Sequence, residues 1–182
     1  MHRRNPWLKF PSKDSQMKNH IKEILFALTD AGVRYIVGGG VAAVLHGVER
    51  VTLDVDIAVD FEAENMDRFA AVIETLGMQP RVPVPIQALR DPEIIRMMLE
   101  EKQALVFSLI DLRDPLRYLD VFLKPELSYQ ALLSYIEPVA VEGRTIHVIS
   151  AMHLLKLKEA IDPPRDKDQL DIRALRRLLG DE

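Results

Sequence analysis

Two aspartates on one predicted strand are the residues best suited to do chemistry. Asp54 and Asp56 lie two positions apart in the segment LDVDIAV, residues 53–59. Because strand side chains alternate, both carboxylates face one way, at Cα atoms about 6–7 Å apart, while Val55 and Ile57 face the other. Two adjacent negative charges cost free energy unless a cation lies between them. The spacing therefore predicts a divalent-metal site.

A run of three glycines lies just upstream of this pair. Gly38, Gly39 and Gly40 follow a predicted strand, residues 35–37, and precede a short segment of helical character, residues 41–46. Glycines at such a junction let the backbone approach a phosphate, and free N–H groups at the helix N-terminus point toward it. A glycine run alone indicates a tight turn and nothing more. Followed by two carboxylates, it favours a site for a triphosphate and its metals.

A third carboxylate, Asp120, interrupts an otherwise apolar strand, residues 116–124. An ionised carboxylate among apolar neighbours is costly unless it is paired or coordinated. One interpretation is a third metal ligand beside the aspartate pair. The other is a salt bridge to an arginine such as Arg50 or Arg117. We favour the metal ligand and keep the salt bridge open.

The remaining segments must position these groups. Hydrophobic spacing and turn residues predict strands, helices and one hairpin that turns at residues 142–143. Strands are expected over residues 35–37, 53–59, 104–112, 116–123 and 139–149, and helices over residues 15–31, 41–46, 61–76, 92–102, 127–135, 150–160 and 165–179. Residues 81–86 contain two prolines and are expected to form an edge strand or a loop. The pattern predicts an α+β fold, a mixed sheet with helices packed on it and two C-terminal helices closing a cleft.

Length and composition set the boundaries of this interpretation. The chain has 182 residues, enough for one domain, which we divide into a flexible basic arm (1–14), a core (15–149) and a C-terminal helical part of the same domain (150–182). With 28 acidic and 24 basic residues, the chain is not a general polyanion binder, although local basic patches remain possible. The absence of cysteine excludes disulfides, thiolate catalysis and cysteine-based zinc sites. No apolar run is long enough to span a bilayer and no secretory signal is present, so we expect a cytoplasmic protein without membrane contact.

The glycines and aspartates together resemble a known signature. Gly39 and Gly40, followed after thirteen residues by Asp54-Val55-Asp56-Ile57, are similar to the hG[GS]…Dh[DE]h motif of the polymerase-β-type nucleotidyltransferase superfamily. The longer string GGxA…HGxxRxTxDxDI is similar to the branch of AbiEii-type abortive-infection nucleotidyltransferases. It is met by Gly39, Gly40, Ala42, His46, Gly47, Arg50, Thr52, Asp54, Asp56 and Ile57. The tail, residues 154–175, is similar to that branch too, with Lys158, Arg165, Lys167, Asp168 and Asp171 at the expected places, whereas residues 79–103 have no counterpart.

The resemblance implies a two-metal nucleotidyl transfer. Asp54 and Asp56 would bind two Mg²⁺ ions, with Mn²⁺ as a possible substitute, and Asp120 would share one metal and help deprotonate the acceptor hydroxyl. The residues implied to bind the nucleotide are Gly39, Gly40, Arg50, Thr52 and Lys158.

Two features qualify this assignment. Many relatives carry serine where this chain has Gly40, so one hydroxyl contact with the triphosphate is expected to be missing. Arg50 is equally compatible with a structural role as the partner of Asp54 or Asp60. We interpret Asp168 and Asp171 as structural residues that form salt bridges with Arg165 or Lys167.

The implied function is transfer of a nucleoside monophosphate from a nucleoside triphosphate to a hydroxyl. An RNA end fits the toxin-like relatives, in which case a cognate antitoxin protein is a possible partner, and a small molecule fits other relatives of the same fold. The alternative is a catalytically idle nucleotide-binding module that acts through a protein partner. An idle pair of buried aspartates would destabilise the protein, which argues against the module. A nuclease or phosphatase that uses the same metals with water is a remote third option.

Overall fold

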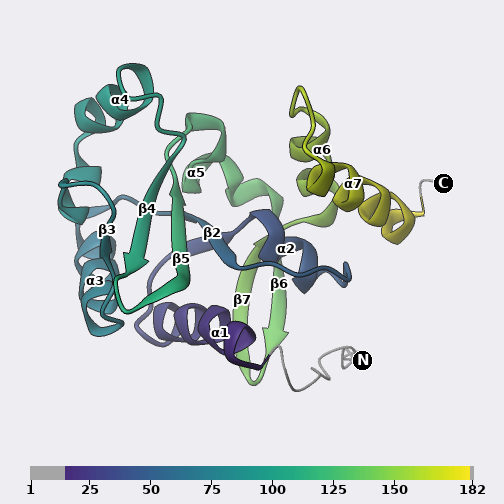
Figure 1. Ribbon diagram of the computed structural model, residues 1–182, viewed down its shortest axis with the longest axis horizontal. Coiled ribbons are helices and arrows are strands. Elements are labelled where there is room, and N and C mark those ends of the chain that lie inside the picture. The colour runs from purple at the N-terminus through teal and green to yellow at the C-terminus, as the bar shows by residue number, and fades with distance from the viewer. Residues whose placement is uncertain (1–14, 181–182) are drawn as a thin grey trace.

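The computed structural model describes residues 15–180, so the predicted basic arm, residues 1–14, lies outside the described residues. A seven-stranded mixed sheet in the order β3-β4-β5-β2-β1-β7-β6 forms the centre (Figure 1). The strands are β1 (Tyr35–Val37), β2 (Asp54–Val59), β3 (Gln79–Pro80), β4 (Val106–Asp111), β5 (Asp114–Phe122), β6 (Ile136–Val141) and β7 (Arg144–Ile149). The β2–β5 and β1–β7 pairs are parallel and the other pairs are antiparallel. The predicted α+β fold is confirmed.

Alternation along β2 and β5 gives the sheet one apolar face and one acidic face. Val55, Ile57, Leu119 and Val121 are each at most 1% exposed. Their neighbours Asp54, Asp56 and Asp120 remain partly or largely accessible on the opposite face. The apolar face anchors the core and thereby fixes the direction of the three carboxylates.

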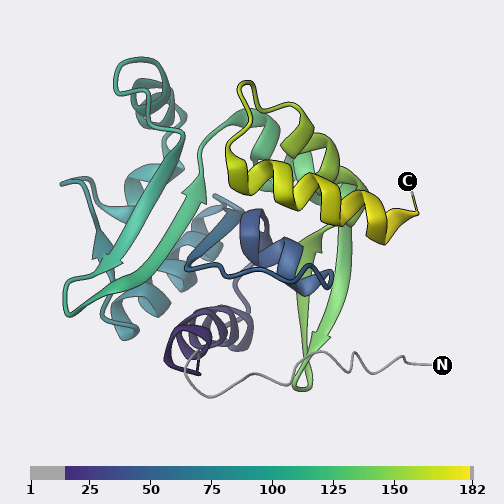
Figure 2. The ribbon, with the colours of Figure 1, turned by 45° about the vertical axis from the view of Figure 1, so that its right-hand side comes forward.

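Two helices, α1 (Ser15–Asp30) and α3 (Ala63–Thr75), cover the apolar face. Tyr35, whose register partner Val59 belongs to this face, donates a hydrogen bond to the Leu25 carbonyl of α1 at 3.0 Å. The acidic face is approached by α2 (Gly39–Leu45) and by α7 (Asp166–Leu179), which packs against α6 (Ala151–Glu159). Figure 2 shows α6 and α7 side by side above α2. No helix within residues 15–180 is both long and apolar enough to cross a membrane.

Local turn chemistry ends these elements where the sequence indicates. Ser150 caps α6 by accepting a hydrogen bond from the His153 N–H at 3.3 Å. The β6–β7 hairpin turns at Glu142 and Gly143, whose φ angles of 47° and 82° suit a tight turn. Both features match the predictions.

Three boundaries differ from the prediction. The short helix α2 begins at Gly39, because the second and third glycines form its first turn and the Ala42 N–H donates to the Gly38 carbonyl at 3.1 Å. The turn after β4 occupies residues 112–113, so Asp114 already pairs with Asp111. The predicted helix over 127–135 is divided into a 3₁₀ turn (Pro125–Leu127), α5 (Tyr129–Leu132) and a second 3₁₀ turn (Leu133–Tyr135), because Ser128 begins a new capped turn.

The segment without a counterpart in the resemblance is ordered. After β3 it continues as a loop, a 3₁₀ turn (Ile86–Arg90) and α4 (Pro92–Glu100), which Asp91 caps by accepting from the Glu93 N–H. The loop alternative for residues 81–86 is therefore the observed one, with the edge strand just before it.

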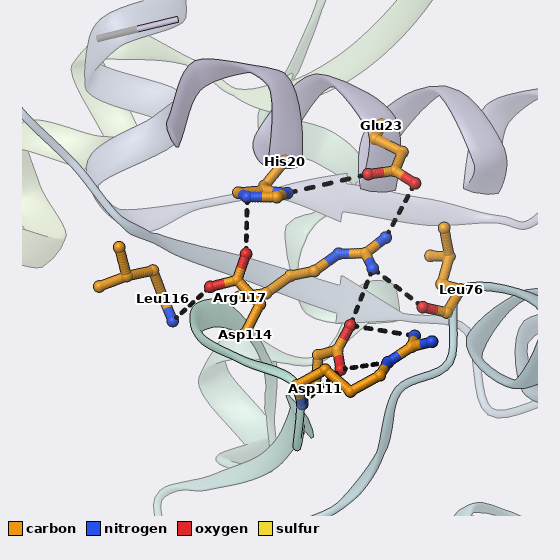
Figure 3. A network of polar contacts seen from close by, with 8 residues as sticks. His20, Glu23, Leu76, Asp111, Asp114, Leu116 and Arg117 are labelled. Atoms are coloured by element: carbon orange, nitrogen blue, oxygen red, sulfur yellow. Dashed lines mark hydrogen bonds and ion pairs between the residues drawn. The ribbon is translucent and has the colours of Figure 1, made fainter. Parts of the chain in front are cut away.

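A buried ionic network lies on the apolar face and joins α1 to the β4–β5 hairpin (Figure 3). Arg117 binds Asp111 at 3.1 Å, Glu23 at 3.1 Å and the Leu76 carbonyl at 2.9 Å. Hydrogen bonds from Arg113, side chain first and then backbone, with a further one from Arg117, lower the pKa of Asp111 to about 2. Arg117 is thus committed to this network and is not the partner of Asp120.

Candidate active site

The three predicted carboxylates meet on the acidic face of the sheet. In the parallel β2–β5 pair Asp56 lies directly opposite Asp120, and Asp54 lies opposite Tyr118. Neighbouring strands are about 4.8 Å apart, so Asp120 is adjacent to Asp56. Asp54 and Asp56 are two positions apart in the sequence. Asp120 lies near them only because β5 pairs with β2 in the sheet.

Asp56 is the most perturbed of the three. Burial, followed by the negative charges of Asp120 and Asp54, raises the pKa of Asp56 to about 6. A hydrogen bond from the Gly40 backbone N–H and the positive charge of Lys167 lower the pKa, but not enough to offset burial. The ionised form of the Asp56 carboxylate is therefore less favourable here than in a solvent-exposed aspartate.

Asp120 has a similar environment. Burial raises its pKa, a hydrogen bond from the Ser108 side chain lowers it, the charge of Asp54 raises it and the charge of Arg81 lowers it, with a net increase. Its Oδ1 atom is buried and has no hydrogen-bond partner within residues 15–180. Neither arginine proposed as a salt-bridge partner reaches it, since Arg117 pairs with Asp111 and Arg50 pairs with Asp171. Asp120 is thus a half-buried carboxylate with one buried acceptor atom that has no partner within residues 15–180.

The donor set fits a divalent cation. In the part of the chain that the structure describes, no three His, Asp or Glu side chains are arranged to hold a metal ion as they stand, so the carboxylates would have to converge on one. Burial and, after it, the charges of the neighbouring carboxylates raise the pKa values of Asp56 and Asp120, so the three groups are unfavourable to one another when ionised. Carboxylate oxygens are the ligands that Mg²⁺ prefers, and a cation would both satisfy Asp120 Oδ1 and remove the repulsion.

The glycine turn lies directly against Asp56. Gly39 has φ +56°, and a Cβ placed on it would lie 1.9 Å from Asp56 Oδ2. The next residue, Gly40, donates its backbone N–H to the Asp56 carboxylate. Position 39 therefore requires glycine for two reasons: the positive φ angle, and the close approach of the Asp56 carboxylate.

Replacing Gly39 with alanine is expected to disable the site more than the fold. The added methyl group must push the Asp56 carboxylate away, and displacements of about 1 Å at a reacting centre typically cost about a hundredfold in rate. Gly143→Ala is the matched control, since Gly143 also has a positive φ (+82°) but nothing within 4 Å of its Cβ position. We expect similar losses of thermal stability in the two variants and a loss of activity in Gly39→Ala alone. Equal activities would show that Gly39 does not position Asp56.

Thr52 occupies the space beside Gly40. A Cβ on Gly40 would lie 2.6 Å from Thr52 Oγ1 and 3.1 Å from Arg50 Cζ. A serine at position 40 would therefore collide with Thr52 and crowd Arg50. The Thr52 hydroxyl lies next to the position of the missing serine side chain, so the contact expected to be missing has a candidate substitute.

Arg50 and Lys158 are both engaged by carboxylates of α7. The Arg50 guanidinium pairs with Asp171, which is 2% exposed, and not with Asp54 or Asp60. The Lys158 ammonium lies 2.7 Å from Asp171 and 3.2 Å from Asp168. In this structure both cations are held beside the acidic face rather than projecting freely toward a nucleotide, and their role in nucleotide binding remains a prediction.

The N-terminal end of α7 supplies two further cations that the predicted site left out. The charge of Lys167 acts on Asp56. Arg165 pairs with Asp168 at 2.6 Å, as expected from their spacing, and also feels the charge of Asp56. The resemblance of the tail had marked both positions, which was the available signal. Two cations facing an acidic site suit a triphosphate better than a bare metal ion.

A separate groove of about 630 Å³ lies between α3 and residues 77–87. It is lined by Ile73 of α3, and by Met78 and Pro80. Pro80 pairs with Leu109, which belongs to the apolar face of the sheet. The groove is therefore on the side away from the three carboxylates.

Comparison with known proteins places this chain in a family. Residues 20–175 match the family model described as aminoglycoside-2''-adenylyltransferase. The chain belongs to this family. It is therefore a nucleotidyltransferase, as the sequence predicted, and the family supports the superfamily assignment without supporting the AbiEii-like branch. No curated protein is similar enough in sequence to match.

Solved structures share the fold of this family member at low identity. One is the antibiotic-resistance factor ANT(2'')-Ia (17% identity, TM-score 0.61, 92% of this chain and 86% of that one). A second is the lincosamide antibiotic adenylyltransferase LnuA, bound to lincomycin (18%, TM-score 0.60, 88% and 97%). A third is an antigenic nucleotidyltransferase-like protein from Paracoccidioides brasiliensis (13%, TM-score 0.56, 90% and 77%). At these identities the likeness shows the fold alone.

Proposed function

We propose that this protein transfers a nucleoside monophosphate, AMP in the first instance, from its triphosphate to a hydroxyl of a small molecule. The single observation that supports this most is the adjacent pair Asp56 and Asp120, partly buried, mutually repelling and beside a glycine turn. Family membership points to adenylyl transfer. A nucleoside triphosphate donor is consistent with the cytoplasmic location expected from the sequence.

Each residue has a proposed role in this reaction. Asp54, Asp56 and Asp120 would hold two Mg²⁺ ions, which when bound neutralise the triphosphate and lower the pKa of the acceptor hydroxyl. Asp120, with Oδ1 on a metal ion, would take the proton of the acceptor hydroxyl on its other carboxylate oxygen as the hydroxyl oxygen bonds to the α-phosphorus. The bond from the α-phosphorus to pyrophosphate breaks on the opposite side.

The positive side chains are proposed to bind the donor. The charges of Lys167 and Arg165 reach Asp56, so a triphosphate bound at the acidic face would lie within their field. Gly39 and Gly40 would lie against the phosphates, and Thr52 would offer its hydroxyl in place of the absent serine. Arg50, fixed by Asp171, would keep the glycine turn and Thr52 in position.

A small acceptor is favoured over an RNA end. The solved relatives include a lincosamide antibiotic adenylyltransferase and ANT(2'')-Ia in complex with adenylyl-2''-tobramycin, both acting on small molecules. The RNA end and the antitoxin partner rest on the sequence resemblance to the AbiEii-type branch, and nothing in the structure adds to it.

The test is transfer of labelled nucleotide. The protein is incubated with α-labelled nucleoside triphosphates, Mg²⁺ and a panel of hydroxyl acceptors that includes total tRNA, and label transfer and pyrophosphate release are measured. We expect label on a small acceptor, lost in Asp120→Asn and retained in Asp67→Asn, whose carboxylate lies on the surface of α3 and pairs with Arg90. Label on tRNA alone would redirect the proposal to RNA. Binding of triphosphate without transfer to any acceptor would favour the idle module.

A further inference from the structure

One row of residues extends from the catalytic carboxylates to the edge of the sheet. Asp56 lies opposite Asp120, and Asp120 lies opposite Ser108. The pairing continues at the edge, where the Arg81 N–H donates to the Ser108 carbonyl at 2.9 Å. Directly opposed residues of paired strands point to the same face of a sheet. The row therefore places one arginine on the acidic face, two strands away from Asp120.

The Arg81 guanidinium is available to a ligand. It is an exposed side chain, and within residues 15–180 no carboxylate pairs with it. Other arginines of the same segment are occupied, since Arg90 binds Asp67, and Arg96 binds Glu93. The positive charge of Arg81 acts on Asp120.

The backbone around Arg81 is restricted. Pro80, Pro83 and Pro85 fix φ at three of the six positions 80–85. A tight turn, in which the Val84 N–H donates to the Val82 carbonyl at 2.7 Å, follows directly. The restricted backbone fixes the position of the Arg81 Cα, so binding an anion has to order only the side chain.

On this basis, and resting on the proposed function, we propose that Arg81 binds an anionic group of the acceptor, a phosphate or a carboxylate close to the reacting hydroxyl. The acceptor is then a small acidic compound rather than a polycationic aminoglycoside. A guanidinium whose charge reaches Asp120 would repel a polycation and would bind a carboxylate or phosphate through two parallel hydrogen bonds.

The surroundings of Arg81 argue against a long polyanion as the acceptor. Binding to RNA depends on several phosphate contacts from clustered basic residues. The segment 79–105 carries four basic residues and four acidic ones, so it offers no basic track. One free arginine fits one anionic group.

A charge-reversal experiment tests the inference. Wild type, Arg81→Gln and Arg81→Glu are assayed for AMP transfer to a sugar phosphate, a sugar carboxylate, the corresponding neutral sugar, tobramycin and tRNA. We expect wild type to prefer one of the two anionic sugars, which identifies the group. Arg81→Glu should lower kcat/KM for that acceptor by about tenfold to a hundredfold, the value of a hydrogen bond to a charged group. This fall in kcat/KM should come from a higher KM for the acceptor, while the KM for ATP stays unchanged.

The control and the contrary outcomes separate this inference from the proposed function. Arg96→Glu reverses the charge of an arginine that pairs only within α4, and its acceptor preference should equal that of wild type. Preference of wild type for tobramycin, for neutral sugar or for tRNA, or an unchanged preference in Arg81→Glu, overturns the inference. If the transfer to one of these other acceptors is lost in Asp120→Asn, the proposed nucleotidyltransferase activity is still supported. If wild type labels none of the acceptors, both proposals fail.

Discussion

The Asp56→Asn variant is expected to be inactive and yet more stable than the wild type in metal-free buffer. Partial burial, followed by the charges of Asp120 and Asp54, raises the pKa of the Asp56 carboxylate to about 6. The neutral amide removes that repulsion and keeps the side-chain volume. A shift of about two units from the usual value of about 3.9 corresponds to about 2–3 kcal/mol, taken as an order of magnitude.

The pH dependence of this gain has a defined sign. Because the pKa of Asp56 is raised in the folded state, the folded protein binds the proton more tightly than the unfolded chain does. The contribution of this group to stability is therefore complete below about pH 4 and is lost as pH rises through about 6. The difference in free energy of unfolding between Asp56→Asn and wild type should grow from pH 4 to pH 8.

Urea unfolding of the metal-free proteins at several pH values measures this difference. Asp67→Asn, which changes an exposed carboxylate on α3, is the matched control and should show no such trend. A wild type that is as stable as Asp56→Asn at pH 8 would mean that the carboxylates do not repel one another, and the main argument for a bound cation would be lost.

The Lys158→Met variant is expected to lose about 3 kcal/mol of stability, because removing one partner of a buried ion pair leaves uncompensated charge. Lys158 lies between Asp168 and Asp171, whose side chains are 1% and 2% exposed. Burial alone would raise the pKa of Asp168, but hydrogen bonds from Arg165 and Lys158 outweigh it and keep the pKa low. Without Lys158, each carboxylate keeps only one arginine.

Lys156→Met is the matched control for this variant. Lys156 is an exposed residue of the same helix, two positions earlier, so its replacement should change stability by less than about 0.5 kcal/mol. Thermal unfolding gives the stability, and ATP titration at low temperature, where both variants are folded, gives the affinity. Loss of ATP affinity in Lys158→Met with stability equal to that of Lys156→Met would contradict the structural role and favour direct nucleotide contact.

Asp56 and Lys158 show which parts of the site the sequence could predict and which it could not. Periodicity identified the strand that carries Asp54 and Asp56, because alternation is a local property of the chain. The sequence also marked Asp120 as an isolated charge among apolar residues. It could not show that Asp120 faces Asp56, since that depends on β2 and β5 being parallel neighbours although Asp56 and Asp120 are 64 positions apart.

The ionic partners were the least predictable part. Arg50 was expected to pair with Asp54 or Asp60 if structural, and its partner is Asp171, separated by 121 positions. Lys158 reaches Asp168 across the bend between α6 and α7. Such pairs form because two helices pack together, which no local pattern encodes. The clash that excludes serine at position 40 depends in the same way on where the Arg50 and Thr52 side chains lie.

Family membership supports the coarser part of the assignment and leaves the AbiEii-like branch unsupported. The glycine–aspartate signature belongs to the whole superfamily, so it identified a nucleotidyltransferase but did not specify the branch. The match over residues 20–175 indicates the aminoglycoside-2''-adenylyltransferase family. Arg81, which we propose selects the acceptor, lies in the segment that the sequence resemblance did not cover.

The central claim, that three carboxylates on one face of the sheet bind divalent metal for nucleotidyl transfer, is tested most directly with Mn²⁺ as a spectroscopic probe. Electron paramagnetic resonance titration of the protein with Mn²⁺ in the presence of ATP counts the bound ions. We expect binding by wild type and by Asp67→Asn beyond that of ATP alone, and its loss in Asp56→Asn and Asp120→Asn. Undiminished Mn²⁺ binding in both of these variants would contradict the claim.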